Sequence, residues 1–141
     1  MPIYAKREVI LDIKSRFDYA FARNKYPGAP SFLPIEIEDE PFIVKTHKIV
    51  PIRVSHGGLK VLGFRVNDFA YLTDIKSIET SEVEKLRGVN KMVVSALHHE
   101  VHHSHFNLQE ALNFISEVNP EKAYLTHICL LYTSPSPRDR G

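Results

Sequence analysis

The sequence contains a single cysteine, Cys129, among its 141 residues. One cysteine cannot form an internal disulfide, so a disulfide-stabilised secreted scaffold is excluded and a reducing, cytoplasmic compartment is expected. The chain also lacks an excess of either charge, because 18 Lys and Arg residues stand against 17 Asp and Glu residues. This balance argues against nucleic acid or a membrane surface as a partner.

Long apolar segments are absent as well. No run approaches the roughly 20 apolar residues of a membrane span, and no apolar region follows the early charges of residues 1–8, so no signal peptide is expected. The composition, 43% hydrophobic and 25% charged, is typical of a soluble globular protein. The length is sufficient for one domain with its own core.

Apolar periodicity predicts the elements of the first half. An amphipathic helix is expected over residues 6–22. Strands are expected over residues 32–37, 42–44, 48–54, 60–66 and 69–73. The last two strands are predicted to form a hairpin around Asn67-Asp68.

The second half alternates helices and strands. A short helix is expected near residues 82–86, capped by Thr80 or Ser81. A buried strand over residues 91–96 and a short strand over residues 123–126 flank a second helix. That helix begins at Asn107, with Glu110 three residues on in a capping-box arrangement. This order predicts an α/β fold with a mixed sheet and helices on one face.

Two strand ends and one loop carry side chains that can bind metal. The run Phe69–Asp74 ends in a carboxylate, and the run Ala123–His127 ends in an imidazole. Five of the eight histidines fall within residues 98–105, between these two runs. Carboxylate oxygen and imidazole nitrogen are both ligands for divalent metal ions.

The ordered set YLTD, ALHHEVHHSHF, LQEAL and AYLTH resembles the second half of the metallo-β-lactamase fold. The resemblance lies with the phosphoribosyl cyclic phosphodiesterase branch and covers roughly residues 2–128. It implies the C-terminal half of an αββα sandwich. It also implies a metal-dependent hydrolase, acting on a small cyclic or sugar phosphate ester with two divalent ions, zinc or manganese.

The resemblance assigns roles residue by residue. Asp74 would bridge two metal ions, and His127 would be a ligand to one of them. His105 would lie beside the scissile phosphate as a general acid or to stabilise charge. His102 falls on a further catalytic histidine of the same loop. His56 would support substrate binding near the pocket.

The chain also departs from the family pattern. The family's H-x-H-x-D-H motif and the histidine ligand that follows it are absent. Ile128-Cys129 stands where a second Ser-His is expected. We therefore expect residues 1–128 to be a partial domain that is inactive alone. Residues 129–141 read as a non-native addition or a disordered end. The assembly could be a homodimer.

Two alternative interpretations rest on the same histidines. His99-Glu100-x-x-His103 matches the H-E-x-x-H pattern of zincin metalloproteases, which requires a helix. The β-branched residues Val93 and Val94, just upstream, favour a strand instead. The other alternative is a non-catalytic metal-binding loop. A loop over residues 97–105 favours the hydrolase, and a helix there favours the protease.

Overall fold

The computed structural model describes residues 1–22 and 26–128, which form two compact units with a boundary after Glu40. The predicted tail, residues 129–141, lies outside the described residues. No helix of the described part is long and apolar enough to cross a membrane. Each unit is described by itself below.

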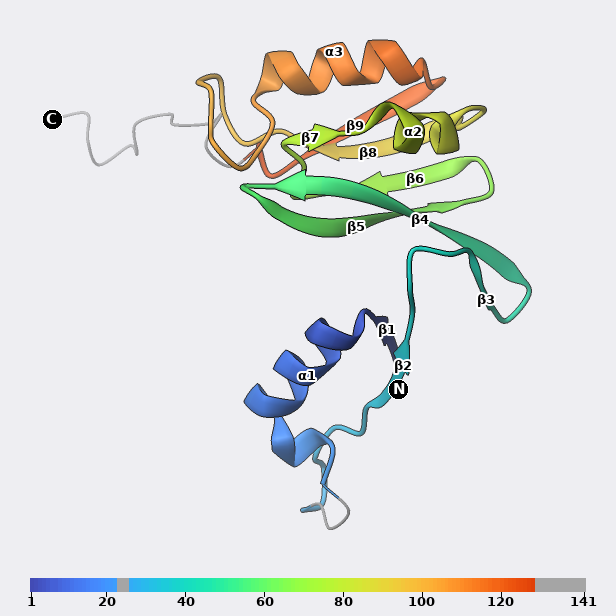
Figure 1. Ribbon diagram of the computed structural model, residues 1–141, viewed down its shortest axis with the longest axis vertical. Coiled ribbons are helices and arrows are strands. Elements are labelled where there is room, and N and C mark those ends of the chain that lie inside the picture. Colours follow the sequence, from blue (N-terminus) through green and yellow to red (C-terminus); the bar gives the residue numbers. More distant parts are fainter. Residues whose placement is uncertain (23–25, 129–141) are drawn as a thin grey trace, which may run out of the picture. The chain divides into compact units, whose positions relative to one another are not determined.

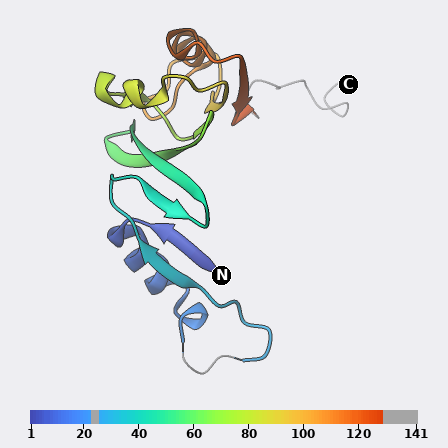
Figure 2. The same ribbon diagram turned by 90° about the vertical axis from the view of Figure 1, so that its right-hand side faces the viewer.

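The N-terminal unit is a small αβ arrangement (Figure 2). Its elements are β1 (Pro2–Ala5), α1 (Arg7–Arg16), the 3₁₀ turn η1 (Asp18–Ala20) and β2 (Leu33–Glu36). Strands β1 and β2 pair in parallel, and α1 lies against one side of the pair. An ion pair of 2.6 Å between Lys6 and Asp39 joins the two strand ends.

The helix predicted over residues 6–22 is shorter than expected. The α-helix ends at Arg16 and a 3₁₀ turn follows. Of the predicted apolar stripe, α1 buries only Ile10, whereas Val9 and Phe17 are 46% and 44% exposed. Strand β1 was not predicted, because its pairing partner β2 is distant in the sequence and no turn signal marks the pair.

The C-terminal unit is a seven-stranded mixed sheet with helices on one face (Figure 1). The first five strands are β3 (Phe42–Val44), β4 (His47–His56), β5 (Leu59–Val66), β6 (Phe69–Leu72) and β7 (Ser77–Ile78). The remaining elements are α2 (Thr80–Val83), η2 (Glu84–Leu86), β8 (Lys91–Ser95), α3 (Leu108–Val118) and β9 (Lys122–Thr126). The strand order is β3-β4-β5-β6-β8-β9, with β7 added beside β4.

Strand direction brings four strand ends to one edge of the sheet. Strands β4, β5 and β6 are successively antiparallel, whereas β6, β8 and β9 are parallel. Strands β4, β6, β8 and β9 therefore run in the same direction. Their carboxyl ends meet at one edge, which is where ligands bind in open α/β sheets.

The core lies between the sheet and the two helices α2 and α3. Ile52, Leu72 and Met92 are fully buried on the covered face, and Phe114 packs onto them from α3. Gly63 of β5 leaves the space that the Leu72 side chain fills, because a Cβ there would overlap it.

The predicted elements of this unit were largely confirmed, with two exceptions. Strand β7 was not predicted, since two residues carry no pattern. The predicted cap at Thr80 or Ser81 was wrong, because both residues lie inside α2 and the helix has no side-chain cap. The capping box of Asn107 and Glu110 was confirmed, with both reciprocal hydrogen bonds present.

Glu82 of α2 is a buried carboxylate that accepts a hydrogen bond from a part of β4 that pairs with neither β3 nor β7. The Arg53 N–H falls between the stretches of β4 that pair with β3 and β7, and it donates to Glu82 at 3.0 Å. The guanidinium of Arg53 and the ammonium of Lys85 also donate, at 2.9 and 2.8 Å. Burial alone would raise the Glu82 pKa, but these bonds outweigh it, so the pKa is lowered.

Glu82→Gln is expected to destabilise the fold by about 2 kcal/mol at neutral pH, because it weakens the hydrogen bonds of a buried carboxylate to two partly exposed cations. A lowered folded-state pKa stabilises above the ordinary glutamate pKa, and the effect is lost as pH falls through the folded value. The difference between variant and wild type should therefore shrink in acid. Urea unfolding at several pH values measures this.

The matched control is Glu84→Gln, which removes an exposed partner of Arg87. Such exposed pairs contribute little, so a change within about 0.5 kcal/mol is expected. Equal effects of the two substitutions would contradict the special role of Glu82.

The face of the sheet opposite the helices carries an exposed aromatic row. Cross-strand register places Phe64, Tyr71, Val93 and Tyr124 in one line across β5, β6, β8 and β9. Tyr71 is 46% exposed and Tyr124 is 54% exposed. Such a contiguous apolar surface is unusual for a monomer and is typical of a face that packs on a partner.

We expect the chain to bind a hydrophobic dye while folded, or to self-associate. Tyr71→Ser combined with Tyr124→Ser should reduce either behaviour, because the two substitutions remove the most exposed rings of the row. Dye fluorescence and light scattering measure the two effects. A monomer that melts cooperatively and binds no dye would contradict the expectation.

Candidate functional site

Two strand ends deliver Asp74 and His127 to the shared edge of the sheet. Asp74 follows β6 and His127 follows β9, each in the left-handed backbone region with φ of 55° and 61°. Residues other than glycine enter this region rarely, Asp and His more readily than most. At each position the backbone therefore turns away from the strand direction at the edge of the sheet.

Backbone hydrogen bonds hold the histidine loop, residues 96–107, beside these strand ends. The Leu97 N–H donates to the Phe106 carbonyl at 3.0 Å, which closes the neck of the loop. The Phe106 N–H donates to the Ile75 carbonyl at 2.7 Å. Since Phe106 follows His105 and Ile75 follows Asp74, this bond sets those two side chains close together.

Three of the predicted histidines, His56, His105 and His127, lie near the carboxylate of Asp74. Oδ1 of Asp74 lies 3.8 Å from Nδ1 of His105 and 3.7 Å from Nε2 of His127. A ring nitrogen of His56 lies within 4.8 Å of the ligand atoms of both Asp74 and His105. The structure thus brings Asp74, His105 and His127 together from separate segments, and the roles assigned to them stay predictions.

His56 comes from the end of β4 and joins the possible ligand group with Asp74 and His105. The sequence assigned it only a supporting role toward substrate. The direction of β4 was the missing information, since it places His56 at the same sheet edge as Asp74. Its ring lies 4.5 Å from the His105 ring, centroid to centroid.

The residues fit the divalent ions that the fold implies. Nδ1 of His105 is buried and has no hydrogen-bond partner, although Asp74 lies just beyond hydrogen-bond distance. Burial and the neighbouring His56 lower the His105 pKa, which favours the neutral imidazole that metal binding requires. Beside it, His56 and Asp74 offer an imidazole nitrogen and a carboxylate oxygen, a donor set suited to a divalent ion.

His102 lies next to this cluster rather than inside it. Its ring centroid is 5.4 Å from that of His105. Burial lowers its pKa, and the nearby His103 and His98 lower it further. Nδ1 of His102 accepts a hydrogen bond of 3.2 Å from the Ser104 N–H. The Ser104 hydroxyl lies 3.1 Å from the same nitrogen. Sequence reasoning did not single out Ser104.

The zincin alternative is not supported by the structure. Residues 97–107 form no helix, so His99 and His103 are not set one helical turn apart with Glu100 between them. Both histidines are exposed.

Nδ1 of His98 is buried without a hydrogen-bond partner, and its ring lies 5.7 Å from that of His102.

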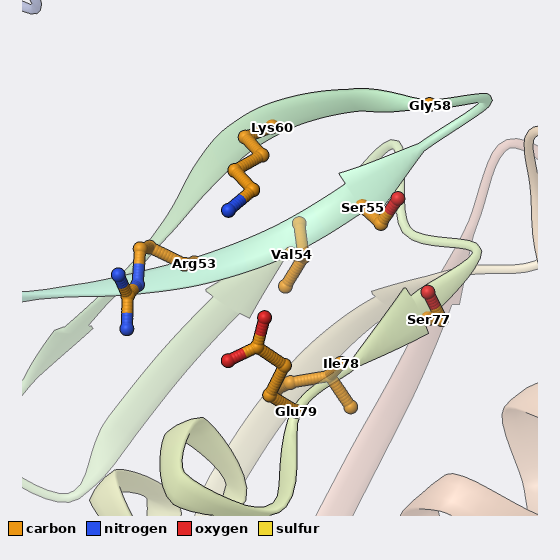
Figure 3. Close-up of a pocket in the computed structure, with 8 residues that line it drawn as sticks. All are labelled: Arg53, Val54, Ser55, Gly58, Lys60, Ser77, Ile78 and Glu79. Carbon is orange, nitrogen blue, oxygen red and sulfur yellow. The ribbon is translucent and has the colours of Figure 1, made fainter.

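A separate pocket of about 260 Å³ lies between β4, β5 and β7 (Figure 3). Its lining includes Arg53, Lys60 and Glu79, and the last two point toward β4 from opposite sides in this view. None of its lining residues belongs to the Asp74 cluster. Two of its lining residues nevertheless lie next to His56: Ser55 precedes it in β4, and Gly58 belongs to the turn that follows β4.

The fold and the histidine–aspartate cluster at the strand ends are typical of the metallo-β-lactamase class of hydrolases. The sequence profile described as Beta-lactamase superfamily domain matches residues 1–128. The chain therefore belongs to this family of hydrolases, whose fold generally binds divalent metal ions.

Two solved structures are similar to the chain. A diphosphatase from the PhnP family shares 28% identity with a TM-score of 0.82, over 91% of this chain and 47% of that chain. The metallo-β-lactamase fold protein YhfI from Bacillus subtilis shares 17% identity with a TM-score of 0.68, over 89% and 51%. The second likeness shows the fold alone.

A curated relative is 32% identical over 130 residues and is called octanoyltransferase, from Porphyromonas gingivalis (strain ATCC BAA-308 / W83). The match covers 91% of this chain and 26% of the relative. The chain thus spans about a quarter of that relative and about half of each solved structure. The relative's activity is not carried over to this chain on so small a share.

The chain is expected to bind a divalent ion through Asp74. Asp74→Asn should weaken zinc binding by at least about tenfold, because it removes the charge that the imidazoles surround. Calorimetric titration of the chelator-treated protein measures the change. Glu100→Gln is the matched control and should leave the affinity unchanged. An equal loss in both variants would indicate adventitious binding by the histidine loop.

Proposed function

We propose that this domain takes part in the metal-dependent hydrolysis of a phosphodiester in a small molecule. The supporting observation is that Asp74 lies near three imidazoles at one edge of the sheet. His105 and His127 lie within 4 Å of Oδ1 of Asp74, and His56 lies in reach of the same ligand group. One carboxylate and several imidazoles are a common ligand set of protein metal sites.

The site residues have two proposed roles, as metal ligands and as groups that contact the substrate. Asp74, His56 and His127 would hold divalent ions, zinc or manganese. When bound, such ions activate water and neutralise charge on a phosphoryl group. His105 would then donate a ring N–H to a phosphoryl or leaving-group oxygen, where charge grows during the reaction. His102 would assist from the adjacent position.

A small cyclic or sugar phosphate ester is the proposed substrate class. The similar PhnP-family structure is described as a diphosphatase, which supports chemistry at a phosphoryl group. The balanced charge of the chain, 18 basic against 17 acidic residues, gives no reason to expect a nucleic acid as the substrate. We therefore propose a substrate no larger than a nucleotide.

The test uses the longest reading frame that contains this chain, and in parallel the 141-residue chain alone. Hydrolysis of bis(p-nitrophenyl) phosphate with zinc or manganese should require the metal and fall at least about 100-fold in Asp74→Asn. The chain alone should be inactive, because the H-x-H-x-D-H ligands are not in its sequence.

Three controls make the result specific. Glu100→Gln should retain the activity, since Glu100 lies outside the cluster. A chelator should abolish turnover, and added metal should restore it. Activity that survives both the chelator and Asp74→Asn would refute the proposed function. Cleavage of RNA in preference to small cyclic phosphates would refute the substrate class.

A further inference from the structure

Ser104 contacts two histidines of the site through its two backbone groups. Its carbonyl oxygen lies 2.9 Å from Nδ1 of His56, and its N–H donates to Nδ1 of His102 at 3.2 Å. Ser104 is only 8% exposed, so water competes little for either bond. A single buried residue therefore bridges the end of β4 and the histidine loop.

The chemistry of the two backbone groups fixes the protons on the two rings. A carbonyl can only accept, so Nδ1 of His56 must carry a hydrogen. A backbone N–H can only donate, so Nδ1 of His102 must carry no hydrogen, and the Ser104 hydroxyl, 3.1 Å away, then donates to the same nitrogen. A neutral imidazole has one N–H. His56 is therefore left with a bare Nε2, and His102 is left with a protonated Nε2.

We propose that Ser104 is a positioning residue that imposes opposite tautomers on His56 and His102. The bare Nε2 of His56 becomes a ligand for a divalent ion, and the Nε2–H of His102 becomes a donor to a phosphoryl oxygen. The roles of ligand and donor rest on the proposed function. The tautomers themselves rest on the hydrogen bonds and exist without metal or substrate.

Gly57 is what lets Ser104 approach so closely. It follows His56 directly, with a φ of +54°, and a Cβ at this position would lie 2.8 Å from Cβ of Ser104. Real Cβ contacts are not that short, so an added methyl group must push the Ser104 backbone away from His56. The glycine and the two hydrogen bonds thus form one unit.

The neighbouring Gly58 provides a matched control. Its φ is +87°, so an alanine there is strained in a similar way, but a Cβ would meet nothing within 4 Å. Gly57→Ala and Gly58→Ala therefore share the backbone strain and differ in the contact with Ser104. Any difference between the two variants reports on that contact.

The experiment is long-range ¹H–¹⁵N correlation of the histidine rings in the chelator-treated chain, at a pH above the ordinary histidine pKa. Comparison with His56→Gln and His102→Gln identifies the two rings. We expect the Nδ1–H form for His56 and the Nε2–H form for His102. Added zinc should shift Nε2 of His56 and leave the Nε2–H of His102 in place.

Gly57→Ala should remove the pure Nδ1–H signature of His56, whereas Gly58→Ala should keep it. The same tautomer on both wild-type rings would overturn the proposal, and so would identical spectra of the two glycine variants. Opposite tautomers in a protein whose full reading frame hydrolyses no phosphodiester would refute the proposed function and leave the tautomer assignment standing.

Discussion

The hydrogen bond from the Phe106 N–H to the Ile75 carbonyl joins the two segments on which the site depends. Both residues are anchored in the core, since Ile75 is fully buried and Phe106 is 8% exposed against the ring of Phe114. His105 and Asp74 each precede one partner of this bond. The packing of an ordinary apolar core therefore sets the spacing of the polar groups at its edge.

Two carboxylates of the C-terminal unit, Glu82 and Asp74, differ in their surroundings, and this difference separates a structural role from a role in the site. Glu82 is 1% exposed and receives hydrogen bonds from the backbone and side chain of Arg53 and from Lys85. The side chain of Asp74 is 46% exposed, and its nearest imidazole nitrogens lie beyond hydrogen-bond distance. A carboxylate with all its partners present stabilises a fold, whereas one that is surrounded but unpaired can accept a ligand.

Sequence patterns predicted what depends on side-chain periodicity. Alternating apolar residues located the long strands, and the spacing of Asn107 and Glu110 located the start of α3. Strand β1 was missed because it pairs with the distant strand β2 without a turn signal, and β7 was missed because it has only two residues. The end of α1 was misplaced because the apolar stripe continues past Arg16 to Phe17 and Phe21, where the chain forms a 3₁₀ turn instead.

The site was predictable in its residues and not in its geometry. Asp74, His105 and His127 stood out because their side chains carry the chemistry. The position of His56 depends on the direction of β4, which pairing decides. The part played by Ser104 could not be read at all, because a backbone N–H and carbonyl are the same in every residue but proline.

The left-handed backbone at positions 74 and 127 also limits what evolution can place there. Valine and isoleucine are strongly disfavoured in this conformation, whereas Asp, Asn, His and Gly are tolerated. The residue types that the turns accept thus overlap with those that bind metal. Substitutions to β-branched apolar residues are therefore disfavoured at these two positions by the backbone conformation itself, whereas residue types that can bind metal are accepted.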